Sequence, residues 1–526
     1  MPIVQQGSVN TTALIVPDLY VQIVPPQNLV INGVPTDVIG VVGTASWGPI
    51  NQPAIVATMS DYASQFGPVV ARQHDMGTQV ATAVQQGAQN FRCVRVTDGT
   101  DTAATTLIQS PDANDFAMML TAGYSGTLGN QLVATVGVGS QANTWRLTIS
   151  LPGLQPELFD NIPGTGAQLW ANMVNAVNNG LSLLRGPSQL VTAQPGQGTP
   201  LGSAPVVASY SFSGGTDGAG SASAATLVGS DVLPRTGLYA LRGQGCSIGL
   251  LADADDPTQW TTQAEFGLSE GVYMILTGPA GDNIRNAVAT KSSAGLDSYA
   301  AKLMFGDWLW WSDATNSTIR LVSPQGFVAG RLANLSPEQS SLNKPLYGVI
   351  GSQKSGTPGT GVTTTYAAAD LQVLIGAGID VIANPQPGGS YWGVRGGHNS
   401  SSDAATDGDN YTRLTNYIAA TLQAGMGQYV GDVINADLFR RIRATQLKFL
   451  QAMLSQGLLG STDGSLPFTV VCDASNNPQS QTALGYVRSD AQVRYQAINE
   501  KFIVNIEGGQ TVQVSKQTLP SGQPQS

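Results

Sequence analysis

Charged side chains are scarce in this chain. Aspartate, glutamate, lysine and arginine together make up 11% of its 526 residues, whereas an average soluble domain has about 25%. The acidic residues outnumber the basic ones, which gives a formal net charge of −10. Because binding to nucleic acid or to an anionic membrane surface requires a basic footprint, we expect neither among its partners. A surface with so few charges is suited instead to extensive contact with other copies of the same chain.

Long apolar runs and cysteines are also rare. No segment approaches the roughly 18–20 uninterrupted apolar residues of a membrane-spanning helix, and residues 1–10 lack the basic and apolar regions of a secretory signal. We therefore expect no direct membrane insertion, and assembly inside a cytoplasm. The three cysteines are Cys93, Cys246 and Cys472. Their odd number and wide separation fit neither a disulfide framework nor a metal site, so we interpret them as small buried residues.

Residues that could support catalysis are few and poorly placed. Two pentapeptides match the G-x-S-x-G pattern of serine hydrolases, around Ser247 and Ser269. Such a nucleophile lies between a strand and the helix that follows it, whereas Ser247 opens a predicted strand and Ser269 follows a predicted helix. His74 and His398 are the only histidines that could act as the base, and we expect both at the surface. We therefore predict that the chain is not an enzyme, with a serine hydrolase as a minor alternative.

Two acidic clusters have the composition of cation sites. Asp253, Asp255 and Asp256 follow an apolar stretch and could hold magnesium. We favour a simpler interpretation, in which Asp256 before Pro257 begins a helix. The second cluster is Asp403, Asp407 and Asp409. It lacks the glutamate that ends an EF-hand loop, so we expect a solvated loop. No lysine follows a glycine, which excludes a P-loop, and we predict neither a metal nor a cofactor.

The chain changes character several times along its length. Prolines bound the first strand-like runs, helical and strand patterns alternate in the middle, and a polar stretch over residues 388–410 resembles a linker before two long helices. We predict an α/β and α+β multidomain protein. Its parts are an extended N-terminal arm (1–35), the first part of a core domain (36–100), a β-rich insertion (101–231), a middle α/β domain (232–399), a C-terminal core segment (400–507) and a C-terminal arm (508–526).

The most informative stretch is TDVIGVVGTASWGPINQPAIVATMSDYASQFG at residues 36–67. Its β-branched run at 38–43 predicts a strand buried on both faces, and the tryptophan, glycine and prolines that follow predict a loop. Ser60 is placed to cap a short helix over 61–66, which Gly67 ends. A strand, a loop and a helix without a reactive side chain indicate a structural role.

This stretch resembles the N-terminal signature of tail sheath proteins from contractile-tailed bacteriophages and contractile injection systems. In that family a GVVGTA.WGP.N.P loop precedes a helix ending in FG. Two further segments resemble the same family. TAGYSGTLGN at 121–130 is similar to a turn of the sheath insertion domain, and GFVAGRLA at 326–333, followed by LNKPL at 342–346, is similar to a helix and a proline segment. The order of these motifs along the chain carries the resemblance.

The resemblance implies an arrangement of domains and arms. Residues 36–100 and 400–507 would pack into one core domain, the insertion would protrude outward, and the arms would add strands to neighbouring subunits. Unpaired strands at the ends of a chain are prone to pair with another chain, which supports this role. A local hairpin across Gly508 and Gly509 is the alternative at the C-terminus. We assign the strand exchange to Tyr20, Val21, Gln22, Ile23, Val24, Phe502, Val504, Ile506, Val512 and Val514.

The resemblance also implies a function and partners. The chain would polymerise as a helical sleeve of stacked rings around a tail tube and contract to drive the tube through the host envelope, by a switch between two packings of the same subunits. Its partners would be other copies of itself, the tail tube protein, and baseplate and tail terminator proteins, in a virion tail assembled in the bacterial host cytoplasm. One helix carries a basic group that would contact an acidic tube surface, or would simply be solvated. This group is Arg440, Arg441, Arg443 and Lys448.

A different class of protein fits part of the composition. The bias toward glycine, serine and threonine is also typical of surface or secreted β-rich adhesins. Because we find no export signal, we keep an adhesin-like structural protein as the main alternative.

Overall fold

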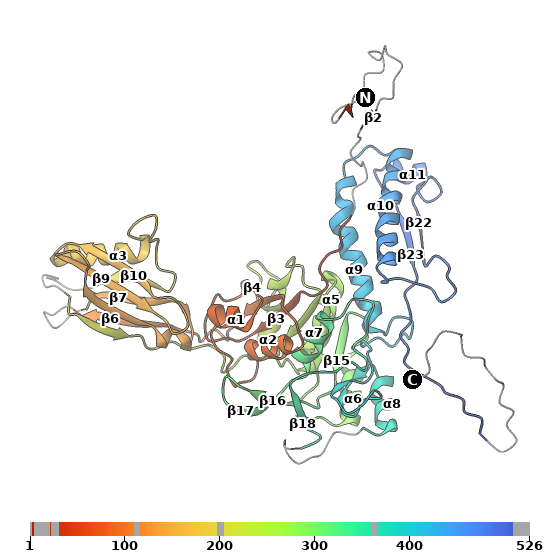
Figure 1. Ribbon diagram of the computed structural model, residues 1–526, viewed down its shortest axis with the longest axis horizontal. Helices are drawn as coiled ribbons and strands as arrows, with labels where there is room; N and C mark the ends of the chain where they lie inside the picture. The colour runs from red at the N-terminus through yellow and green to blue at the C-terminus, as the bar shows by residue number, and fades with distance from the viewer. Residues whose placement is uncertain are drawn as a thin grey trace, which may run out of the picture.

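The centre of the computed structural model is a seven-stranded sheet of order β19-β15-β14-β13-β3-β5-β4 (Figure 1). The structure describes residues 3–4, 21–22, 31–109, 116–196, 205–356, 358 and 366–508. Neighbouring strands are parallel except for β5 and β4. In sheet order the strands are Ile379–Asp380, Ala301–Met304, Tyr273–Thr277, Ile248–Leu251, Ile39–Gly43, Phe91–Arg95 and Pro53–Val56. Every residue of β3 is buried, which confirms the strand predicted in the signature stretch.

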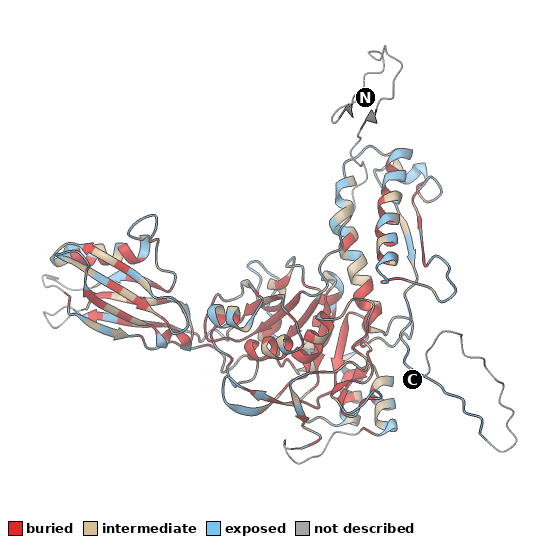
Figure 2. Cartoon of the chain, in the orientation of Figure 1, coloured by how far each residue is buried: buried red, intermediate tan, exposed pale blue. Residues whose placement is uncertain are grey.

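Helices cover both faces of this sheet and bury it, as the red strands of Figure 2 show. One face is covered by α1 (Met59–Phe66), α2 (Met76–Gln85) and α7 (Gln325–Ala333). The other is covered by α4 (Ala224–Val228), α5 (Trp260–Glu270), α6 (Ile284–Ala294) and α8 (Ala368–Gly376). Such layers are expected where strands alternate with helices along the chain, so the mixed α/β class is confirmed.

One predicted domain pairing is wrong. We expected residues 36–100 to complete their core with residues 400–507, and residues 232–399 to form a separate domain. Instead β3, β4 and β5 share one sheet with β13, β14, β15 and β19, and Ile39 lies opposite Ile248. The physical reason is that a parallel strand buried on both faces needs a hydrogen-bonded neighbour along each edge. Strand β5 supplies one neighbour for β3, and β13 from the middle of the chain supplies the other.

Helix α1 begins at Met59, earlier than predicted. Its N-cap is Thr58 rather than Ser60. The Asp61 amide donates to the Thr58 hydroxyl at 3.1 Å, and the Thr58 amide donates to the Asp61 carboxylate at 3.0 Å. This reciprocal pair is a capping box, which satisfies two backbone donors and outweighs a single serine cap. Gly67 ends the helix as predicted, with a φ of 85° that glycine adopts without strain.

The strands between residues 103 and 211 build two small sheets that share a core with α3 (Gly166–Asn179), whereas α4 packs on the seven-stranded sheet. The sheets have the orders β11-β7-β6 and β10-β9-β8-β12. Figure 1 shows this domain projecting from the main body. Its strands are β6 (Ala103–Gln109), β7 (Phe116–Ser125), β8 (Val133–Val138), β9 (Thr144–Ser150), β10 (Glu157–Pro163), β11 (Val191–Pro195) and β12 (Ala208–Ser211).

The tryptophan loop of the signature stretch packs against this projecting domain. Trp47 is buried, and its ring meets Tyr124 edge-to-face with 5.3 Å between centroids. The Leu128 amide donates to the Ser46 carbonyl at 3.2 Å. A Cβ at position 126 would lie 2.1 Å from the Ser46 oxygen, so only Gly126 permits this close approach. The loop therefore joins the insertion to the main body.

Arg95, at the end of β5, strengthens the same junction. It is completely buried, and its Nη1 donates to the carbonyls of Gly48 at 2.9 Å and Ser125 at 2.8 Å. Burial lowers the pKa of Arg95, and the nearby Asp217 opposes that shift. A guanidinium that bonds carbonyls from two domains fixes their relative position more rigidly than a flexible connection would.

The segment from Asp409 to Val493 forms a helical module with a short hairpin. Helices α9 (Asp409–Met426) and α10 (Ala436–Ser455) pack with β22 (Phe468–Val471) and β23 (Asp490–Val493). Figure 1 shows this module standing away from the seven-stranded sheet. The remaining elements are β16 (Leu309–Asp313), β17 (Thr318–Val322), β18 (Val349–Ser352), β20 (Ile382–Ala383), β21 (Gly393–Val394) and α11 (Gln479–Thr482).

Candidate assembly elements

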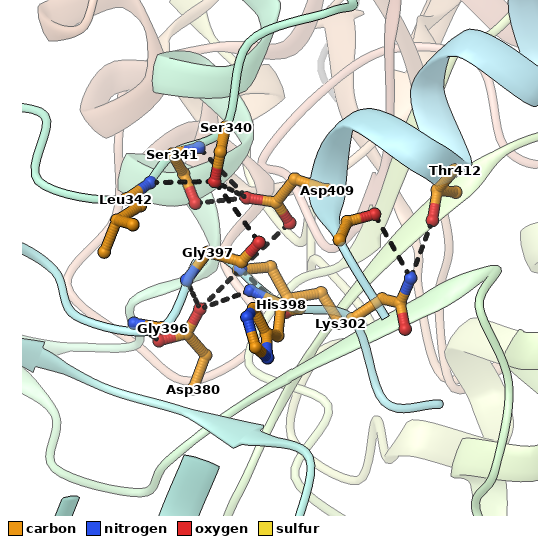
Figure 3. Close-up of polar contacts among 12 residues, drawn as sticks. Lys302, Ser340, Ser341, Leu342, Asp380, Gly396, Gly397, His398, Asp409 and Thr412 are labelled. Carbon is orange, nitrogen blue, oxygen red and sulfur yellow. Dashed lines mark hydrogen bonds and ion pairs between the residues drawn. The ribbon is translucent and has the colours of Figure 1, made fainter. Parts of the chain in front are cut away.

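A buried cluster of charges joins the sheet to the helical module (Figure 3). Lys302 of β15 donates through Nζ to Asp380 at 2.6 Å, to Asp409 at 3.0 Å and to the His398 carbonyl at 2.9 Å. The three charged side chains are at most 1% exposed. We call Lys302, Asp380 and Asp409 the polar hub. Because each ammonium proton has an acceptor, the cost of burying this charge is offset.

Asp409, the first residue of α9, connects this helix to two other segments of the chain. Its Oδ1 accepts a hydrogen bond from the Tyr273 hydroxyl at 2.6 Å, and its Oδ2 accepts from the Ser341 amide at 3.0 Å and hydroxyl at 2.5 Å. Burial by itself would raise the pKa of Asp409, but Lys302 and these hydrogen bonds outweigh it and lower the pKa to about 2. Burial would likewise lower the pKa of Lys302, but Asp380 and Asp409 raise it. Lys302 and Asp409 are therefore ionised at neutral pH.

The stretch predicted as a polar linker wraps around this hub, which corrects that prediction. Within residues 388–410, the amides of Gly396 and Gly397 each donate to Asp380 at 2.7 Å. Asp409 is buried rather than part of the predicted solvated loop, whereas Asp403 is exposed. The segment is polar because it supplies hydrogen bonds to buried charges, and composition alone does not distinguish that role from solvation.

Sequence reasoning missed Lys302 and Asp380, although a signal was present. Each is a lone charge inside an otherwise apolar strand, in AKLM at 301–304 and in IDVIA at 379–383. Lysine and aspartate are almost never fully buried unless they are paired. Each of these lone charges therefore indicated that a buried partner of opposite charge exists, without identifying that partner.

The β22–β23 hairpin offers edges for strand addition. Among the described residues it forms a two-stranded sheet, with Phe468 opposite Val493 and Val471 opposite Asp490. Arg443 of α10 donates to the Val470 carbonyl at 3.1 Å, so a side chain already occupies part of β22. Strand β23 is the more accessible edge. An edge of this kind is a template for a strand from another chain.

Among the C-terminal residues assigned to strand exchange, Phe502, Val504 and Ile506 form no strand within this chain. Residues 501–508 have no regular secondary structure, because a strand needs a partner. The side chains of Phe502, Ile503, Val504 and Ile506 are 82%, 80%, 61% and 87% exposed. Four exposed apolar side chains within five residues are a costly feature of an isolated chain. Val512 and Val514 lie outside the described residues.

The N-terminal candidates are described only in part. Val21 and Gln22 form β2 (Val21–Gln22), which pairs in parallel with β1 (Ile3–Val4) of the same chain. Tyr20, Ile23 and Val24 lie outside the described residues. Residues 31–36 run along α9, where the Val34 amide donates to the Thr421 hydroxyl at 3.2 Å.

The basic group on α10 is less available than its sequence indicates. Arg440 is paired with Asp437 at 2.5 Å, and Arg441 with Asp432 at 2.9 Å and Asp437 at 3.3 Å. Lys448 is exposed, and among the described residues it has no ion pair. Asp437 lies three and four positions before the two arginines, a helical spacing at which opposite charges meet. The sequence therefore contained the reason why this face is partly neutralised.

The residues considered for catalysis and metal binding have structural contacts. Ser247 donates to the Val38 carbonyl at 3.1 Å and Ser269 to the Phe266 carbonyl at 3.0 Å. His74 is buried, not at the surface as expected, with its Nδ1 2.8 Å from the Ala252 carbonyl oxygen. Its burial follows from its position just before α2, where it contacts residues that directly follow the inner strands β3 and β13. All three cysteines are buried, as predicted.

The acidic cluster around Asp256 has the simpler role that we favoured. Asp256 accepts from the Thr258 amide at 2.9 Å and caps the turn that leads into α5. Asp253 is buried and accepts from Gln79 at 2.9 Å. The described part of the chain has no group of three potential ligand side chains placed to hold a metal ion. None of its helices is long and apolar enough to cross a membrane.

Comparisons with known proteins give a match by structure only. No protein-family model and no curated protein matches the sequence. The sheath tail protein from Desulfitobacterium hafniense matches with a TM-score of 0.58 at 14% identity, over 85% of this chain and 92% of that one. The sheath tail protein from Listeria innocua matches with a TM-score of 0.58 at 14% identity, over 85% and 91%.

A third similar structure is the sheath complex of an extracellular contractile injection system, PVC, in its contracted state. The TM-score is 0.54 at 11% identity, and the match covers 94% of this chain and 97% of that one. Each comparison extends over most of both chains, so the similarity is not limited to the central sheet. This chain therefore has the fold of contractile tail sheath proteins.

Proposed function

We propose that this chain is the structural subunit of a contractile tail sheath. It polymerises as a helical sleeve around a tail tube and contracts to drive the tube through the host envelope. The observation that carries the proposal is the extent of the structural match, 85–94% of this chain and 91–97% of the sheath proteins. An alignment of that extent takes in domains outside the α/β body, and that body alone is common to many functions.

The exposed apolar arm supports polymerisation. Phe502, Ile503, Val504 and Ile506 are mostly exposed in the isolated chain, and β23 has a strand edge to which a neighbour can add. Addition of one chain's arm to another chain's hairpin would satisfy both features, since backbone hydrogen bonds give affinity and alternate side chains give register. We extend the same role to Tyr20, Val21, Gln22, Ile23 and Val24, and to Val512 and Val514.

The proposed contraction uses packing energy. Subunits linked by flexible arms could rotate as rigid bodies from an extended lattice to a shorter one that buries more surface. The polar hub and the Arg95 junction support such a rigid subunit, because both fix neighbouring domains through buried contacts. The low content of charge also favours extensive contact between copies.

The proposed partners are the tail tube protein along the inside of the sleeve, and baseplate and terminator proteins at its ends. We place the tube contact on α10. Because Arg440 and Arg441 are already paired with Asp437 and Asp432, Lys448 is the most available cation of the group. The proposed location is a tail assembled in the host cytoplasm.

Removal of the C-terminal arm tests the proposal. We expect the full-length chain to form hollow striated tubes by negative-stain electron microscopy, and a variant that ends at Glu500 to remain soluble without forming tubes. The truncation leaves every residue of the hairpin and the polar hub in place, so loss of tubes would not reflect loss of the fold. Tubes from the truncated chain would refute the arm's role, and absence of tubes from the full-length chain would argue against a sheath.

A further inference from the structure

The segment after β23 is strapped to the beginning of α9 before it becomes exposed. The Tyr495 ring packs against Tyr411 with 5.8 Å between centroids, and its hydroxyl lies 3.1 Å from that of Thr415. One residue further, the Gln496 carbonyl accepts from the Asn410 side chain at 2.9 Å. These contacts set the path by which the C-terminal arm leaves the body of the protein.

The final contact on this path is made by His398. Its Nε2 lies 2.9 Å from Glu500 Oε1, and its Nδ1 lies 3.4 Å from Asp407 Oδ2. The imidazole is 17% exposed, and the carboxylates of Asp407 and Glu500 are 27% and 37% exposed. Beyond Glu500, residues 501–508 are exposed and have no hydrogen bond to the rest of the described chain. The pair of His398 and Glu500 therefore marks the point at which the arm becomes free.

The polar hub holds the backbone of this histidine in place. The His398 amide donates to Asp380 at 3.3 Å, and its carbonyl accepts from Lys302 at 2.9 Å (Figure 3). Both contacts involve the backbone, so they do not depend on the charge of the imidazole. The ring is consequently presented to Glu500 by a rigid support, and a change in its charge acts on the arm rather than on the fold.

We propose that His398 is a proton-controlled latch for the C-terminal arm. When the imidazole is protonated, both ring nitrogens donate, one to Glu500 and the other to Asp407. When it is neutral, a single N–H remains, and the other nitrogen presents a lone pair to a carboxylate. Histidine is the side chain that ordinarily changes charge between about pH 5 and 8. The latch is therefore closed under mildly acidic conditions and weakened as the pH rises.

The charges around His398 also weaken the latch when the imidazole loses its proton. Burial raises the pKa of Asp407, and the carboxylates of Glu500 and Asp403 raise it further, while His398 opposes them. Loss of the imidazolium charge thus leaves Asp407 and Glu500 as like charges without the cation that separates them. Lys302 contacts only the backbone of His398, so it does not replace that cation at the latch.

The latch would regulate the proposed strand exchange, and in this respect it rests on the proposed function. A closed latch directs the apolar segment Phe502–Ile506 along one path, whereas an open latch lets it search a wider volume for a neighbour's hairpin. The conformation of the arm in a single chain is nevertheless measurable without any assembly.

A nitroxide attached to Asn499→Cys tests the latch. Residue 499 is exposed, and the three native cysteines are buried, so labelling is selective for the new thiol. In the full-length chain, kept dilute enough to remain monomeric, we expect the mobile fraction of the electron paramagnetic resonance spectrum to rise about threefold between pH 6 and pH 8.5, as for a partly screened ionic contact. A mobile fraction that does not change with pH would overturn the proposal.

Variants identify the group responsible. His398→Gln keeps a neutral donor for Glu500 but cannot change charge, so its spectrum should be the same at both pH values. Glu500→Gln should give a mobile arm at both pH values. Glu507→Gln, which alters an exposed carboxylate on the same arm, is the matched control and should retain the full pH response. A pH response that persists in His398→Gln would overturn the assignment, whether or not the chain forms tubes.

Discussion

Two buried aspartates at the beginnings of helices have different pKa values, which shows that burial alone does not set the pKa of a carboxylate. Asp409 is the first residue of α9 and Asp75 is the N-cap of α2, and neither has measurable exposure. Their pKa values shift in opposite directions. Burial raises the pKa of Asp75 to about 7, whereas Lys302 and several hydrogen bonds overcome burial and lower that of Asp409 to about 2.

The difference between them lies in the counter-ion. Lys302 Nζ lies 3.0 Å from Asp409, whereas the nearest cation to Asp75 is Arg72, with its Nε 3.9 Å away. Both carboxylates accept backbone hydrogen bonds, from the Ser341 amide and from the Thr78 amide. Similar burial thus accompanies opposite shifts of the two pKa values, and the proximity of a cation decides between them.

Removal of the hub cation should have the largest effect. Lys302→Met leaves Asp380 and Asp409 buried as like charges without a cation, so we expect the free energy of unfolding to fall by about 3–5 kcal/mol. Urea denaturation followed by tryptophan fluorescence measures this change. Because the hub joins the sheet to α9, we also expect proteases to cleave first between these two regions. A loss below about 1 kcal/mol would show that the hub does not support the junction.

The second effect is the contribution of Asp75 to stability as the pH changes. It should be smaller than the effect of Lys302→Met, and acidification should give a gain of stability rather than a loss. The folded-state pKa of Asp75, about 7, lies above its unfolded value near 3.8, so the folded state binds the proton more tightly. Stability should therefore increase as the pH falls from 7 toward 4. Between pH 7 and 5 we expect a gain of about 2 kcal/mol from this group.

The variant Asp75→Asn isolates this contribution. The amide keeps an oxygen that can accept from Thr78 but cannot titrate, so the parent chain's gain on acidification should disappear from the variant. Thermal unfolding at pH 7 and pH 5 for both proteins gives the comparison. An equal pH response in both would mean that Asp75 is ionised throughout this range.

Neutralisation of an exposed charge should have the smallest effect. Arg440 has a 78% exposed side chain and pairs with Asp437, which is 57% exposed. Water screens such a pair, so Arg440→Ala should change the free energy of unfolding by less than about 1 kcal/mol. Urea denaturation of Arg440→Ala and of Lys302→Met under the same conditions compares the two losses in the free energy of unfolding. A loss similar to that of the hub variant would show that α10 depends on its surface charges.

Much of the secondary structure was predictable from local patterns. The β-branched run at 38–43 is the buried strand β3, and the two long helices expected after the polar stretch are α9 and α10. These predictions depend on neighbouring residues along the chain, which set propensity and periodicity. The capping residue of α1 was misassigned because Ser60 and Thr58 are chemically similar candidates, and only the reciprocal contact with Asp61 distinguishes them.

The candidate site was predicted less completely. Phe502, Val504 and Ile506 were assigned to strand exchange from the unpaired chain end and the resemblance; they are exposed in the single chain, and the exchange itself stays a prediction. The polar hub was missed because its members come from residues 302, 380 and 409. A sequence shows that a lysine lies in an apolar strand, but not which distant carboxylate lies beside it.

The sequence by itself determined the local elements, the scarcity of charge, and the signature loop with its tryptophan and glycine. Tertiary structure alone decided that residues 36–100 complete a sheet with the middle of the chain, and that the pKa of Asp409 is lowered while that of Asp75 is raised. The physical reason is range. Helix caps and strand periodicity depend on a few adjacent residues, whereas strand partners and buried counter-ions depend on contacts between segments far apart in the sequence.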